Sequence, residues 1–211
     1  MLSVRADISQ LNISVVFPES PTLDHFNRPD WKLGPDWSGD DNPGSYRVER
    51  DQVDVRNGGT IYWQTGSFDI NQEAFVTLTK VDPNGTQQGV VLKAQGAGPD
   101  AAPKDKYGVI AATYNANTGA VQVRTFLPRG KDWQPYDPVT VTFRDGDQLG
   151  AQAHSNGNVN IFRNHELVGT VTLNVDDQKF FNNNGGRIGL SFGRSADDAI
   201  FDDFGGGTVT P

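Results

Sequence analysis

Short stretches of alternating apolar and polar residues, separated by turn-forming residues, run through nearly the whole chain. About a dozen of them follow one another between residues 46 and 204, and helical periodicity is almost absent. The breaks are rich in glycine, asparagine, aspartate and proline, as in PNG at 83–85, DGD at 145–147 and NGN at 156–158. The sequence therefore predicts an all-β protein, a two-sheet antiparallel β-sandwich of the jelly-roll kind with a short N-terminal arm.

The expected strands share this period of two and lie at 46–50, 52–56, 60–64, 74–82, 88–93, 107–114, 120–127, 139–143, 148–154, 159–163, 166–173, 187–192 and 199–204. Only the segment 176–184 is expected to form a short helix.

The last predicted strand, 199–204, carries large apolar residues on both of its faces. Strict alternation places Ile200 and Phe204 on one face and Phe201 on the other, and the glycines at 205–207 are expected to end the strand. Asp202 and Asp203 lie among these apolar residues. Because an unpaired buried charge is costly, both carboxylates are expected to have partners.

Residues 1–21 are expected to form a segment of their own, followed by one jelly-roll domain at 22–211. Apolar residues at alternate positions from Leu11 to Phe17 predict one strand, which Pro18 and Pro21 end. Two arrangements stay open: an added strand of the same domain, or an arm that docks on another subunit.

The composition excludes several classes of partner. The chain has 211 residues, no cysteine and a formal net charge of −8, and no basic block offsets this charge, which argues against nucleic acid. No apolar run approaches the roughly 20 residues of a membrane-spanning helix, so membrane insertion is not expected. Residues 1–10 lack the apolar core of a secretory signal. The protein is expected to stay in the cytoplasm or to leave by another route, such as assembly into a virus particle.

Three groups of residues, taken in order, resemble a known family. They are DHFNR at 24–28 with LGPDW at 33–37, then GDQLGA at 146–151 with GNVNIFRN at 157–164 and LVG at 167–169, then GGRIGL at 185–190 with FDDF at 201–204. This order resembles the concanavalin A-like (laminin G-like) jelly-roll domains of bacteriophage minor tail proteins and of carbohydrate-binding modules. The chain departs from that pattern at Asn164 and His165, where the family more often has Asn-Gly.

The resemblance implies a structural calcium ion. In such jelly rolls the first and last strands lie side by side and can share one Ca²⁺, which takes oxygen ligands. The matching positions are Asp24 on the opening segment and either Asp202 or Asp203 on the closing strand, and the loop at 40–42, which contains Asp41, is expected to add carbonyl ligands. The alternative is that these carboxylates accept backbone N–H groups or pair with Arg28 or Arg187.

A polar loop at 128–138 that contains aromatic residues is the predicted carbohydrate-binding region. Sugars stack on aromatic rings, while polar side chains bond their hydroxyls. The candidates are Trp133, Tyr136 and Arg129 in this loop, and Trp63 on the strand at 60–64. Trp63 directly follows Tyr62, so one of the two rings must face away from the core. The alternative for each ring is ordinary packing.

A catalytic site is not predicted. A glycosidase needs two carboxylates about 5–9.5 Å apart, and jelly-roll glucanases commonly carry them as Glu-x-Asp-x-x-Glu on one strand. The glutamates of this chain do not have that spacing: Glu19, Glu49, Glu73 and Glu166. Nucleophile-elbow, zinc-protease and phosphate-loop motifs are also absent from the sequence.

The leading hypothesis, which rests on the resemblance, is a non-catalytic structural and binding domain of a phage tail. Residues 1–21 would contact other tail proteins, and the loops would recognise a polysaccharide of the host surface. The resemblance also suggests a homo-oligomer, although coiled-coil heptads are absent. The alternatives are a glycan-degrading enzyme of the same fold, a ligand-free decoration protein, and an extracellular location instead of the virion.

Overall fold

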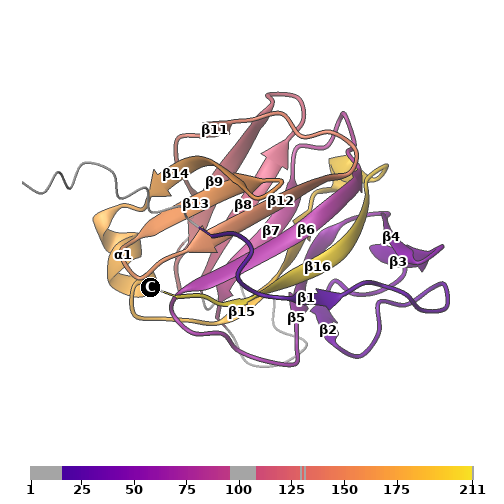
Figure 1. Ribbon diagram of the computed structural model, residues 1–211, viewed down its shortest axis with the longest axis horizontal. Coiled ribbons are helices and arrows are strands. Elements are labelled where there is room, and N and C mark those ends of the chain that lie inside the picture. The colour runs from indigo at the N-terminus through magenta and orange to yellow at the C-terminus, as the bar shows by residue number, and fades with distance from the viewer. Residues whose placement is uncertain (1–15, 96–107, 129, 131, 211) are drawn as a thin grey trace, which may run out of the picture.

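The computed structural model describes residues 16–95, 108–128, 130 and 132–210. These residues form two antiparallel β-sheets that pack face to face, with a short helix at one edge of the sandwich (Figure 1). The predicted all-β sandwich is therefore confirmed.

Sheet A has the strand order β14-β13-β12-β6-β16-β4-β3, and β1 also pairs with β16. Its strands are β1 Thr22–Asp24, β3 Tyr46–Glu49, β4 Gln52–Val55, β6 Gln72–Lys80, β12 Asp147–Ala153, β13 Asn158–Arg163, β14 Glu166–Thr172 and β16 Ile200–Thr208. The first and last described strands thus lie side by side near the middle of this sheet.

Sheet B has the strand order β10-β9-β8-β7-β15-β5-β2, and β11 also pairs with β9. Its strands are β2 Trp37–Gly39, β5 Gly59–Trp63, β7 Gln88–Ala94, β8 Val109–Asn115, β9 Ala120–Phe126, β10 Gln134–Pro135, β11 Val139–Thr140 and β15 Arg187–Phe192.

Outside the sheets lie the helix α1 Val175–Phe181 and the 3₁₀ turn η2 Arg194–Ala196. Helix α1 falls within the predicted helical segment, and Asn174 caps it by accepting hydrogen bonds from the backbone N–H groups of Asp176 and Asp177. Neither described helix is long and apolar enough to cross a membrane.

The closing strand β16 departs from strict alternation. Asp203 adopts a φ of 48°, and the pairing with β6 shifts register on both sides of Asp202, which is the signature of a β-bulge. Phe201 and Phe204 consequently both point into the core between the sheets, each with an exposed fraction of 0%. The expectation that these two rings lie on opposite faces was wrong, because the bulge inserts extra backbone between them.

The glycines at 205–207 continue β16 instead of ending it. They pair with Phe75, Ala74 and Glu73 of β6. A Cβ added at Gly205 would lie 2.1 Å from the Phe75 ring, so this strand can pass beside Phe75 only without a side chain there. The expected end of the strand at Phe204 was therefore wrong.

The described part of the N-terminal segment packs on its own domain, on the outer face of sheet A. The Phe17 ring stacks on Phe162 at a centroid distance of 4.1 Å and meets Phe75 edge-on at 6.1 Å. Buried Glu73 accepts hydrogen bonds from the backbone N–H groups of Glu19 and Ser20. The predicted strand from Leu11 to Phe17 falls mostly on residues 1–15, which lie outside the described residues.

Candidate functional site

The outer face of sheet B, turned away from sheet A, carries two rows of side chains that run across its strands. The strand register places Ser38, Tyr62, Gly189, Val91, Ala111, Arg124 and Pro135 in the first row. A second row runs beside the first: Thr60, Ser191, Gly89, Thr113 and Gln122. In the first row Gly189, Val91 and Ala111 lie between the larger side chains of Tyr62 and Arg124. The middle of the outer face of sheet B is thus a strip of small side chains, with a larger side chain on either side of it in this row.

One side of this strip is built around Trp133, which lies just before β10. Its ring meets Phe126 of β9 edge-on, at a centroid distance of 5.6 Å. The guanidinium of Arg124 lies 4.9 Å from the centre of the Trp133 ring, within the range of a cation–π contact. Trp133 is half-buried, so part of its ring stays accessible to solvent.

The other side is built in a similar way around Tyr62 of β5. The guanidinium of Arg187 lies 5.5 Å from the Tyr62 ring centre and donates a hydrogen bond of 3.3 Å to the Ser38 hydroxyl. Tyr62 is 3% exposed, so it forms the floor of this side and not an open stacking surface. An arginine–aromatic pair therefore lies at each side of the strip.

Two polar groups on this face have no hydrogen-bond partner within the described ranges of the chain. The first is the Arg124 guanidinium: no described residue accepts a hydrogen bond from it, and its Nε is buried. Burial also lowers the pKa of this guanidinium below its usual value. The hydroxyl of Thr113, a residue 1% exposed, likewise has no partner there. Buried polar groups without partners are uncommon in folded proteins, and they indicate places where a ligand or water can bond.

Two cavities lie at the sides of sheet B. The larger, about 370 Å³, borders the strip at the Thr60–Ser191 end and is lined by polar groups that include Asp40, Gln87 and Arg194. The smaller, about 330 Å³, lies between the loop before β10 and the start of α1 and contains no residue of the two rows; its wall includes Thr125, whose hydroxyl bonds Asp177 of α1. Both are large enough to hold small polar ligands.

The structure separates the four predicted carbohydrate-binding residues. Trp133 lies on the outer face of sheet B, whereas Tyr136 turns toward α1, where its hydroxyl donates to the Asp177 carboxylate and accepts from the Asn174 backbone N–H. Burial and the Asp177 carboxylate raise the pKa of Tyr136 to about 12. Arg129 lies outside the described residues.

Trp63 belongs to the core and not to a binding face. Its ring contacts Trp37 at a centroid distance of 5.5 Å and Phe204 at 6.2 Å, so it cannot stack on a sugar. The neighbouring Tyr62 takes the outward position. The sequence showed that one of the two rings must face out, but not which one.

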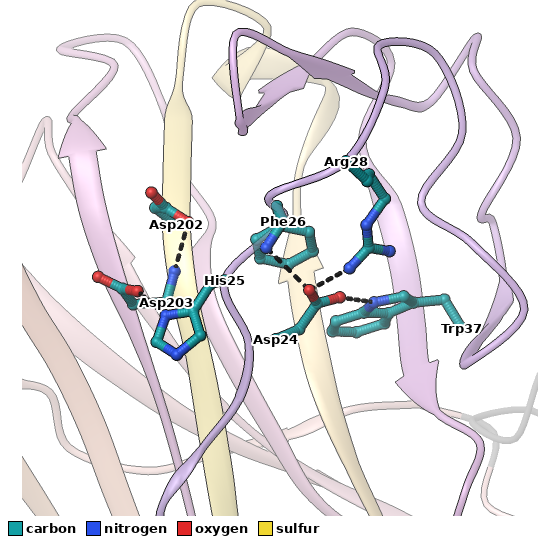
Figure 2. A network of polar contacts seen from close by, with 7 residues as sticks. All are labelled: Asp24, His25, Phe26, Arg28, Trp37, Asp202 and Asp203. Atoms are coloured by element: carbon teal, nitrogen blue, oxygen red, sulfur yellow. Dashed lines mark hydrogen bonds and ion pairs between the residues drawn. The ribbon is translucent and has the colours of Figure 1, made fainter.

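The predicted metal ligand Asp24 is engaged by protein donors. One carboxylate oxygen accepts from the Phe26 backbone N–H at 2.8 Å and from Arg28, and the other accepts from Trp37 Nε1 at 2.8 Å (Figure 2). Asp24 is 5% exposed. This is the alternative arrangement that the sequence left open for the carboxylate, with Arg28 as its ion-pair partner. Both oxygens already accept hydrogen bonds, so protein donors alone satisfy the Asp24 carboxylate.

Of the other predicted metal ligands, Asp202 and Asp203 lie near Asp24 on the neighbouring strand β16 (Figure 2). Asp203 pairs with His25 at 2.7 Å, and Asp202 accepts a hydrogen bond of 2.8 Å from the Asp203 backbone N–H (Figure 2). Asp41 lies in the loop after β2. Within the described part of the chain, no group of three or more histidine or acidic side chains is placed to hold a metal ion.

The sequence matches no family model and no curated protein. Solved structures with a similar architecture do exist, and they are concanavalin A-like jelly rolls. The fold of this chain is therefore the concanavalin A-like jelly roll, as its sequence motifs suggested.

Three of these structures show the range of the fold. The carbohydrate-binding module CBM66 from Bacillus subtilis aligns with 14% identity and a TM-score of 0.52, over 85% of this chain and 95% of that one. SCLam, a non-specific endo-β-1,3(4)-glucanase from family GH16, aligns with 10% identity and a TM-score of 0.55, over 90% and 91%. The Ca²⁺-bound exoplasmic/lumenal domain of VIP36 aligns with 12% identity and a TM-score of 0.54, over 90% of each chain. At these identities the similarity shows the fold alone.

Proposed function

We propose that this chain is a non-catalytic carbohydrate-binding domain that holds a glycan on the outer face of sheet B. The observation that carries the proposal is Trp133, a partly accessible ring fixed between Phe126 and Arg124 at the side of a strip of small residues. A sugar can stack on such a ring while polar side chains bond its hydroxyls. Similarity to the carbohydrate-binding module CBM66 supports the proposal at the level of the fold.

The side chains on this face support binding without hydrolysis. Glycoside hydrolysis requires two carboxylates on either side of the bond to be cleaved. The strand positions of the two rows described above carry small, polar or basic side chains and no carboxylate. The glucanase of similar fold keeps the enzyme alternative open, and release of reducing ends from a bound polysaccharide is the assay that would establish it.

Replacing Trp133 by alanine is expected to weaken polysaccharide binding by about tenfold or more, because a central aromatic anchor often carries this much binding energy. Affinity electrophoresis against a panel of polysaccharides (laminarin, mannan, levan and polygalacturonate) identifies a ligand, and titration calorimetry then compares the two proteins. Trp31→Ala is the matched control. Trp31 also stacks with an arginine, Arg47, at 5.9 Å, but it hydrogen-bonds to β3, outside sheet B. Equal affinity of the Trp133→Ala variant and the parent protein would contradict the proposed binding face.

A structural calcium ion at Asp24 is tested by thermal unfolding. A ligand that binds only the folded protein raises its stability, so removal of such an ion lowers the melting temperature. Because Phe26, Arg28 and Trp37 already donate to Asp24, we expect the same melting temperature in calcium and in EGTA. A clear decrease in EGTA would show that a metal ion does contribute to the fold.

We also propose, from the sequence resemblance, that this domain is part of a phage tail. In that proposal residues 1–21 contact other tail proteins, and the outer face of sheet B meets a polysaccharide of the host surface. Within this segment, Phe17 packs on its own domain, against Phe75 and Phe162.

A further inference from the structure

The Arg124 guanidinium is placed on the outer face of sheet B without an acceptor. It lies over the Trp133 ring at 4.9 Å, and among the described residues none accepts a hydrogen bond from it. Other arginines of this protein pair with carboxylates, for example Arg28 with Asp24 and Arg163 with Asp147. Arg124 thus has a charge, a position against the Trp133 ring, and donors that no described residue occupies.

The strand neighbours of Arg124 offer no acceptor either. The residue beside it on β8 is Ala111, and the residue beside it on β10 is Pro135, so neither has a side-chain acceptor. On the same face Thr113, 1% exposed, keeps a hydroxyl without a partner in the described part of the chain. A partly buried cation and a buried hydroxyl, each without a partner among the described residues, are groups that a ligand acceptor would satisfy.

We propose that the glycan held on the outer face of sheet B is acidic, and that one of its carboxylate or sulfate groups accepts hydrogen bonds from the Arg124 guanidinium. This inference rests on the proposed function, since it names the chemical class of the glycan. A guanidinium matches an oxyanion because two parallel N–H groups meet two oxygens, which a single sugar hydroxyl cannot do.

Because the protein as a whole is acidic, the proposal requires a local binding site for an acidic glycan. The formal net charge is −8, so general electrostatics repels an acidic polymer. Binding of such a polymer must therefore come from a local site. The two rows themselves carry no carboxylate; Asp40, which accepts a hydrogen bond from the Thr60 backbone N–H, and Asp132, next to Trp133, lie at their sides.

The test compares pairs of polymers that differ only in their acidic groups. Polygalacturonate is measured against its fully methyl-esterified form, and dextran sulfate against dextran, by titration calorimetry on the whole chain. We expect at least one acidic polymer to bind about tenfold or more tightly than its neutral partner, because charge-assisted hydrogen bonds contribute this much. The first pair reports on carboxylates and the second on sulfates.

Two variants assign the effect to Arg124. Arg124→Gln is expected to remove the preference for the acidic polymer while the melting temperature changes little, because the guanidinium makes no hydrogen bond to another described residue and only its contact with the Trp133 ring is lost. Arg47→Gln is the matched control: it changes the net charge by the same amount and also removes an arginine–tryptophan contact, but at Trp31. This control is expected to keep the preference.

The outcomes separate this inference from the proposed function. Equal affinity for acidic and neutral polymers, or binding of neutral glycans such as laminarin alone, overturns the acidic class but leaves a glycan-binding face. An equal loss of both affinities in Arg124→Gln overturns it as well. Failure of every polysaccharide to bind overturns the proposed function and this inference with it.

Discussion

Replacing Asp24 by alanine is expected to lower the free energy of unfolding by about 3 kcal/mol or more, the cost of breaking a buried ion pair. The substitution leaves three donors without their acceptor: Phe26 N–H, Arg28 and Trp37 Nε1. It also removes support from a strained turn, because Phe26 has a φ of 51° and Asp24 bonds its N–H. The large effect follows from these buried donors and not from the charge alone.

Thermal and urea unfolding measure this effect. For a chain of this size, a loss of about 3 kcal/mol corresponds to a decrease of about 6–12 °C in melting temperature. Asp24→Asn keeps one oxygen but brings an NH₂ group toward a donor, so its effect should be intermediate. Asp203→Asn is the control, since Asp203 and its partner His25 are exposed, and exposed pairs contribute about 1 kcal/mol or less. Equal stabilities of the Asp24→Ala and Asp203→Asn variants would contradict the role assigned to Asp24.

The architecture could be predicted because its signal is local and repeated. Alternation and turn residues give the strand positions, since a strand face and a tight turn each depend on a few neighbouring residues. The turn at Asn164 and His165 is an example of a turn position that the local sequence predicted. Both residues have a positive φ, 49° and 74°, as the twist of a two-residue hairpin turn requires, although His165 stands where glycine is easier.

The orientation of individual rings could not be predicted, because it depends on backbone details with no local signal. Asp203 enters the left-handed region and turns Phe204 to the same side as Phe201, and the motif FDDF does not announce this bulge. The choice between Tyr62 and Trp63 is set by the pairing of β5 with β2 and β15. Strand alternation is therefore reliable only up to the first bulge.

The candidate site could be predicted in part. Trp133 is visible in the sequence because it stands in a polar loop, away from the alternating strands whose rings fill the core. Arg124, in contrast, lies in an ordinary alternating strand, AVQVRTF, and gives no sequence signal. Its importance comes from two facts of the fold, the Trp133 ring beside it and the missing acceptor among the described residues. Sites that span several strands depend on register, which a single sequence does not show.

Lys93 is a buried cation that joins the end of β7 to α1. Its exposed fraction is 0%, and its Nζ donates to the backbone carbonyl of Phe181 at 2.8 Å and to that of His154 at 3.4 Å. Burial lowers the pKa of Lys93 to about 8, from an ordinary value of 10.5. The ammonium form is thus less favourable in the folded protein than in the unfolded chain.

This shift predicts that Lys93 makes stability increase with pH between about 8 and 10.5. Below pH 8 both states hold the proton, so the cost of the buried charge is fully present. Between the two pKa values the folded protein loses the proton while the unfolded chain keeps it, so the unfolded state binds more protons and stability rises. The difference between an ordinary pKa of 10.5 and one of about 8 corresponds to about 3 kcal/mol at most.

Urea unfolding of the parent protein and of Lys93→Met from about pH 7 to 10.5 measures this increase. The free-energy difference between the two proteins should grow by up to about 3 kcal/mol in favour of the parent, whichever is more stable at the lower pH. Tyrosines with raised pKa values, such as Tyr136, lose their effect in the subtraction because both proteins contain them. Lys80→Met, whose lysine side chain is 44% exposed, is the matched control for removing a lysine at the surface. A constant difference for Lys93→Met would mean that the Lys93 ammonium is stabilised in the folded protein, because the two carbonyls would then fully offset its burial.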